Sequence, residues 1–175
     1  MEISLHNQLN ALESAGPVRL VAVRPHLEYL FRHALVQEAA YASLLKGDRR
    51  ELHLVVGEAL ERLNPDNPEE LAPTLARHFE QAGAHDKAAR YLTRAGEYAS
   101  AVYANGEAIN FFRAAFEQLA QLLRSGTDEL QAWEARILEL RERVGDLFEL
   151  TGLHDSAREN YQKALDRTVE DDRTG

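Results

Sequence analysis

The sequence predicts a mainly α-helical protein: an antiparallel stack of helical repeats, preceded by a small β-hairpin. Two observations carry this prediction. Segments 75–95 and 144–164 match each other, each with large apolar residues at helical spacing, then a glycine, then small alanines. From residue 68 onward, apolar residues recur at helical spacing in almost every stretch between turn signals. Gly83 and Gly152 end the first arm of each pair, because glycine enters the left-handed conformation without a Cβ clash.

Composition fits a globular protein and sets limits on its function. The 175 residues are 45% hydrophobic and 28% charged, with a net charge of −9 and no cysteine. An acid excess argues against direct nucleic-acid binding, and it favours a basic partner or serves solubility alone. No apolar run approaches the roughly 18 residues that a membrane span needs, and the first residues lack the features of a signal peptide. We therefore expect a cytoplasmic protein with no membrane contact.

The N-terminal third mixes helices with two short apolar runs. Residues 3–15 predict a helix, and 18–23 and 27–31 predict the strands of a hairpin joined by a turn at 24–26. A helix is expected over 33–46, ended by Gly47. A second is expected from an Asp48 cap, completed by Glu51, to residue 63. The buried stripe expected on this second helix is Leu52, Val55, Val56, Ala59, Leu60 and Leu63.

The prolines at 65 and 68 mark the clearest break, and we place the domain boundary there. Residues 1–67 form the first part, 68–170 the repeats and 171–175 a frayed tail. The repeat helices are expected near 69–82, 86–103, 105–125, 128–151 and 155–168. Pro73 could kink the first of these, and Asn105 is expected to cap the third. Gly96 costs about 1 kcal/mol relative to alanine inside a helix, which leaves the continuity of 86–103 open.

The helix pairs resemble tetratricopeptide repeats, whose period is about 34 residues. The second pair carries Val144-Gly145-x-x-Phe148, Ala157-x-x-x-Tyr161 and Ala164. The first carries Leu75-Ala76-x-x-Phe79, Ala88-x-x-x-Leu92 and Ala95, and a third, partial match has Gly96, Ala108-x-x-x-Phe112 and Ala115. The family's tryptophan position holds Ala72 and Arg141 here, and its late proline is replaced by Ser100 and Val169. These departures leave the regularity of the superhelix open.

Residues 29–41, YLFRHALVQEAAY, resemble a segment of the STAND-class signal-transduction ATPases. In that class an AAA-type ATPase module is followed by a winged helix and a tetratricopeptide tail. Such proteins are often fused to class III adenylate or guanylate cyclases or to transcriptional regulators. The resemblance covers roughly residues 29–165 and implies that residues 1–67 hold a winged-helix remnant plus two linking helices.

The resemblance also implies that nucleotide chemistry lies outside this chain. No G-x-x-x-x-G-K-[ST] motif occurs in it, so ATP or ADP and Mg are expected only on an upstream ATPase domain. In STAND-type ATPases a winged-helix histidine contacts the nucleotide phosphate, and His33 is the candidate here. The alternative is that His33 only caps its helix or packs against Phe31 and Tyr29.

The sequence predicts no enzyme, cofactor or metal site in this chain. No pair among the seven histidines has the i, i+4 spacing of a helical metal site. No Ser-His-Asp or nucleophile-elbow pattern appears, and the carboxylates have the spacing of a solvent-exposed helix face.

The expected function is therefore protein–protein interaction, as the scaffold or sensor tail of a signal-transduction ATPase. The ligand-facing positions implied by the resemblance are Glu70, Arg77, Glu80, Gln81, Glu139, Glu142, Asp146 and Glu149. The last four form an acidic stripe that would take a Lys/Arg-rich segment of a partner, or face solvent. The alternatives are a free-standing adaptor and a small-molecule inducer sensor with its ligand in the superhelix groove.

Overall fold

The computed structural model describes residues 2–22, 28–65, 69–125 and 130–174, giving only the backbone of 2–6, 130–131 and 165–174. The described part is mainly α-helical, with a two-stranded antiparallel sheet, which confirms the predicted fold class. It forms two compact units, residues 1–49 and 50–175. Each unit is described by itself.

The first unit holds the predicted hairpin. Helix α1 (Glu2–Ala15) ends at Gly16, and strands β1 (Val18–Ala22) and β2 (Glu28–Phe31) pair antiparallel, with Val18 opposite Phe31 and an irregularity between Leu20 and Ala22. The predicted turn at 24–26 lies outside the described residues. Helix α2 (Ala34–Ser43) ends three residues before the predicted end, because Leu44 takes an extended conformation.

Helix α3 (Lys46–Leu63) leads from the first unit into the second. The predicted Asp48–Glu51 capping box is wrong, because α3 begins two residues before Asp48 and places it inside the first turn. The predicted buried stripe is also largely wrong. Four of its six residues are 40–69% exposed: Leu52, Val55, Val56 and Leu63. The face of α3 that packs on the core instead carries Leu54, Gly57 and Leu60.

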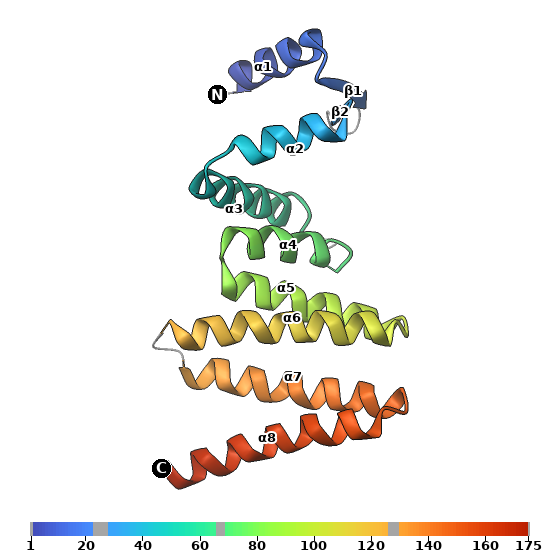
Figure 1. Cartoon of the computed structure of the whole chain (residues 1–175), viewed down its shortest axis with the longest axis vertical. Coiled ribbons are helices and arrows are strands. Elements are labelled where there is room, and N and C mark those ends of the chain that lie inside the picture. Colours follow the sequence, from blue (N-terminus) through green and yellow to red (C-terminus); the bar gives the residue numbers. More distant parts are fainter. Residues whose placement is uncertain (1, 23–27, 66–68, 126–129, 175) are drawn as a thin grey trace. The chain divides into compact units, whose positions relative to one another are not determined.

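The second unit continues with five antiparallel helices that lie one after another (Figure 1). They are α4 (Ala72–Ala82), α5 (His85–Ala101), α6 (Asn105–Arg124), α7 (Leu130–Leu150) and α8 (His154–Thr174). Consecutive helices pack together, so this is the tetratricopeptide-like stack that the sequence predicts. Its core includes Phe79, Phe112, Leu75, Leu119 and Ile137, all fully buried.

Several boundaries differ from the prediction for local reasons. The compact units divide between Arg49 and Arg50, and in the second unit Leu54 and Leu60 of α3 pack against the core. The domain boundary predicted after residue 67 stays a prediction. Pro73 lies in the first turn of α4, where its missing N–H leaves no hydrogen bond unmade. Asn105 is not the cap of α6 but its first helical residue, after Ala104. Helix α8 continues to Thr174, through most of the segment predicted to fray.

Close contacts between a helix glycine and an aromatic ring join three pairs of helices. A Cβ added to Gly57 would lie 2.9 Å from Cε1 of Phe79. At Gly96 the distance to Phe112 Cε1 would be 2.5 Å, and at Gly145 the distance to Tyr161 Cε1 would also be 2.5 Å. Helix α5 is continuous through Gly96. The ring of Phe112 takes the space that a Cβ at this position would need.

Three of the helix ends share one turn. Gly83 and Gly152 adopt the predicted left-handed conformation, with φ of 76° and 77°. In both turns the following N–H bonds back to the carbonyl five residues earlier, as in a Schellman motif. The α5–α6 turn has the same hydrogen bonds, but Tyr103 occupies the left-handed position with φ of 60° and is 88% exposed. A residue with a Cβ pays about 1–2 kcal/mol for the left-handed conformation. A tyrosine therefore does not indicate a turn in the sequence as a glycine does.

Candidate functional site

The exposed carboxylates of α7 are the predicted site residues that the structure keeps together. Glu142, Asp146 and Glu149 are exposed and lie at helical spacing on α7. The negative charges of all three act on the hydroxyl of Tyr161 in α8. Tyr161 also donates a 2.6 Å hydrogen bond to Asp146 Oδ1. That hydrogen bond, burial and the negative charge of the carboxylates together raise the pKa of Tyr161 to about 12. Three negative charges thus gather on one surface of the α7–α8 pair, which we call the acidic face.

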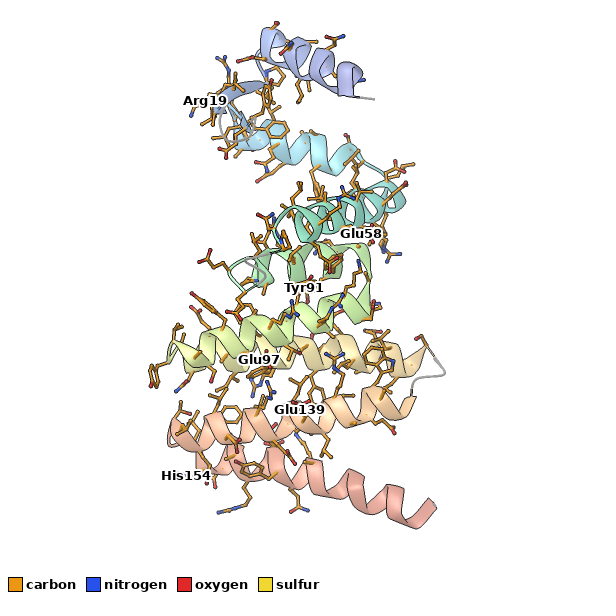
Figure 2. All side chains as sticks on the ribbon, turned by 180° about the vertical axis from the view of Figure 1, so that it is seen from behind. Arg19, Glu58, Tyr91, Glu97, Glu139 and His154 are labelled. Atoms are coloured by element: carbon orange, nitrogen blue, oxygen red, sulfur yellow. The ribbon has the colours of Figure 1, made fainter. Side chains whose placement is uncertain are left out.

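A shallow depression of about 620 Å³ adjoins the acidic face. Its lining combines Glu149 of α7 with four residues of α8: His154, Arg158, Tyr161 and Gln162. His154, labelled in Figure 2, lies where the chain turns from α7 into α8. Arg158 also forms an exposed ion pair with Asp155, at 3.8 Å. The surface therefore offers carboxylates together with a phenol and an open depression.

Glu139, the fourth residue of the predicted acidic stripe, has a different role. Arg143 pairs with Glu139 at 2.8 Å and also with Glu97 of α5. The hydrogen bond that Arg143 donates to Glu97 is the main cause that raises the pKa of Arg143, so this guanidinium stays charged. Glu97 and Glu139 are labelled in Figure 2 on their two helices. Glu139 thus helps to join α5 to α7 through Arg143, and the sequence prediction had missed both Glu97 and Arg143.

The first predicted set is not a single surface. Glu70 is exposed and lies before α4 begins, and Gln81 is exposed near its end. Glu80 accepts a 3.2 Å hydrogen bond from Gln118 of α6, and burial raises the pKa of its carboxyl. Gln118 in turn lies 2.7 Å from Nδ1 of His85, so these side chains link α4, α5 and α6. Arg77 is exposed and acts electrostatically on His53 of α3 and on its neighbour His78.

A cluster that the sequence did not predict holds α3 to α5. Glu61 of α3 accepts a 2.5 Å hydrogen bond from the Tyr91 hydroxyl and pairs with Lys87 at 3.1 Å. Burial alone would raise the pKa of Glu61, but the bonds from Tyr91 and Lys87 lower it. Lys87 also pairs with Glu58 at 3.2 Å and lies over the Phe79 ring. In the sequence, only the i, i+3 spacing of Glu58 and Glu61 indicates this cluster. Lys87 and Tyr91 lie on another helix, and spacing along the chain does not connect them with the glutamates.

His33 occupies the cap position before α2 and is exposed. Its side chain makes no capping hydrogen bond, although its carbonyl accepts the first bonds of the helix from Val36 and Gln37. The predicted role of His33 is contact with a nucleotide phosphate. Nothing in the described residues tests this contact, so it stays a prediction.

The described residues also bear on metal binding and on membrane crossing. Among the described residues, no three His, Cys, Asp or Glu side chains come together in a way that could hold a metal ion. None of the described helices is long and apolar enough to cross a membrane.

Fold and site define a class, a tetratricopeptide-like helical stack with an acidic face. No model of a known protein family matches the chain. It is similar to an uncharacterized protein of Rhizobium meliloti (strain 1021), with 29% identity over 126 residues. The match covers 72% of this chain and 12% of the relative, so this chain matches a small part of a much longer protein. The crystal structure of MamA aligns with 82% of this chain and 99% of its own, at 13% identity and a TM-score of 0.21, which is too low to define a shared fold.

Proposed function

We propose that this chain is a protein-interaction module, non-catalytic by itself, that binds a Lys/Arg-rich segment of a partner on the acidic face of α7 and α8. The observation that carries this proposal is the gathering of Glu142, Asp146 and Glu149 around Tyr161, on exposed surface beside an open depression. Carboxylates that are exposed and close together attract a cationic segment, and an open surface admits an extended peptide.

The depressions described favour a peptide over an apolar inducer. A second one, of about 280 Å³, lies between α6, α7 and α8 and is lined mostly by charged or polar side chains, among them Arg113, Glu117, Glu159 and Lys163. A small-molecule site is typically concave and mostly apolar, with few polar groups. Neither depression has this character, so the inducer-sensor alternative gains no support from them.

In its full context we propose that the module is the tail of a signal-transduction ATPase. The segment order of hairpin, helices and repeats supports this proposal. The relative from Rhizobium meliloti, of which this chain matches only 12%, fits a module that is part of a longer protein. A bound partner would act by mass action, shifting the ATPase between resting and active states by its differential affinity for the two. His33 would contact the nucleotide in the resting state.

Charge reversal tests the acidic face. The probe is a fluorescent peptide of alternating lysine and alanine, titrated into the full chain at low and at high salt. We expect Glu142→Lys/Glu149→Lys to weaken binding by about 10-fold or more at low salt, and by less at high salt, because exposed charges are screened over about 10 Å at 0.1 M ionic strength.

A matched control makes the same change of net charge elsewhere. Glu51 and Glu107 are exposed and lie on α3 and α6, so Glu51→Lys/Glu107→Lys should leave most of the affinity. An equal loss in both double variants would mean that the peptide responds only to net charge, and the proposed site would be wrong.

A further inference from the structure

Two histidines from different helices meet at the contact between α3 and α4. Nδ1 of His53 lies 3.0 Å from Nδ1 of His78, and the ring centroids are 5.0 Å apart with the planes tilted by 50°. The residues are 25 positions apart in the chain, and both are partly buried. A direct bond between two imidazole nitrogens at this distance requires a proton on one nitrogen and a lone pair on the other.

A proton fits between these nitrogens better than a metal ion does. The described residues supply no third His, Cys, Asp or Glu ligand that would complete a metal site with this pair. The guanidinium of Arg77 also acts on both rings and would repel a cation. The pair can therefore be neutral or carry one extra proton, with the bond between the rings kept. Two extra protons would place N–H groups face to face and break it.

The pair lies beside other contacts between α3 and the rest of this unit. The C-terminal half of the α3 contact has the Glu58 and Glu61 pairs with Lys87, the Tyr91 hydrogen bond and the packing of Leu60. Gly57 follows with its contact to the Phe79 ring. Nearer the start of α3 in this unit, Leu54 packs on the core and His53 meets His78. Losing the bond between the two rings would remove a direct contact between α3 and α4 at this point.

We propose that His53 and His78 form a proton-sensitive latch, which holds the part of α3 around His53 against α4 at neutral pH and releases it in acid. The Glu61–Lys87–Tyr91 cluster keeps the second half in place, because its carboxylate and ammonium stay ionised over the same range. Arg77 acts electrostatically on both rings, and His53 also acts on His78.

The direction of the pH effect follows from the two rings. Burial, followed by the charge of Arg77, lowers the pKa of His53; burial, followed by His53 and Arg77, lowers that of His78. The unfolded chain, with histidine pKa values of about 6.5, therefore binds more protons than the folded one as the pH falls below neutral. The stabilisation is present above about pH 6.5 and is lost as the pH falls through the lowered values of the pair.

Thermal unfolding of the full chain at pH 7.5 and 5.5 tests the latch. We expect the drop in Tm between these pH values to be larger in the wild type than in His53→Gln/His78→Gln by roughly 2–4 °C. Hydrogen exchange of the part of α3 around His53, compared with the double variant at each pH, should rise in acid only in the wild type. His154→Gln removes an exposed histidine of α8 and should keep the wild-type pH response.

An equal pH response in the wild type and the double variant would overturn the latch. If the double variant does not fold, nitrogen NMR of the imidazoles in the wild type decides the matter. Two separated titration steps, at least one below about 6.5, support the latch. Two independent single steps near that value contradict it.

Discussion

Phe79→Ala is expected to lower the free energy of unfolding by about 3–5 kcal/mol. The Phe79 side chain is 0% exposed and stacks on Tyr91, with ring centroids 5.5 Å apart. Its ring also covers Gly57 of α3, so the truncation opens a cavity where α3, α4 and α5 meet. Urea unfolding followed by the fluorescence of Trp133, the single tryptophan of the chain, measures the change.

Tyr103→Ala provides the control for Phe79→Ala. Tyr103 is also an aromatic residue of the second unit, but it is 88% exposed. Its loss should change the unfolding free energy by less than about 1 kcal/mol, because no cavity forms. If Phe79→Ala proved as mild as this control, the described core around α3, α4 and α5 would be wrong.

Gly96→Ala should destabilise the protein, although alanine is the better helix former. Alanine gains about 1 kcal/mol over glycine inside a helix. The added methyl group would nevertheless lie 2.5 Å from Cε1 and 2.7 Å from Cδ1 of Phe112, a ring that is 2% exposed and cannot swing into solvent. Overpacking of this kind costs typically 1–3 kcal/mol and can cost more, and here it must also offset the helix gain. We therefore expect a net loss of up to about 2 kcal/mol in the same urea titration.

Gly106→Ala is the matched control, because Gly106 lies in the first turn of the helix that carries Phe112. A Cβ at Gly106 meets nothing within 4 Å. This variant should be neutral or slightly more stable. A Gly96→Ala variant that gained stability as Gly106→Ala does would show that α5 and α6 do not approach each other as described.

Helix spacing was sufficient to predict the stack, but not the orientation of α3. In α7 the apolar stripe points to the core as expected, with Ile137, Leu140, Val144, Leu147 and Phe148 all buried. In α3 four of the six residues chosen for hydrophobicity are exposed, and the buried face is centred on Gly57. A glycine carries no hydrophobic signal, yet its missing side chain is what admits the ring of Phe79. Apolar periodicity therefore does not predict the buried face of a helix that packs through a glycine.

The acidic face was predicted because its residues share one helix, where spacing fixes which side chains are neighbours. The bonds that hold the helices together were not predicted. Arg143 reaches Glu97 across 46 positions, Lys87 reaches Glu61 across 26, and His53 meets His78 across 25. Each pair depends on the packing of two helices, and no spacing along the chain indicates it. Glu139 is different, because Arg143 lies one turn further along α7 and the i, i+4 spacing of the two residues could have indicated their pair.

The measurement that tests the ATPase-tail proposal most directly is the DNA sequence of about one kilobase upstream of the Met1 codon. If the chain is the tail of an ATPase, we expect an open reading frame that continues upstream and encodes a G-x-x-x-x-G-K-[ST] segment after a strand pattern. His33 would then be the first residue to substitute in the longer protein, with retained ADP as the readout. A stop codon in frame before Met1, with no such segment between them, would contradict the account and leave a free-standing adaptor.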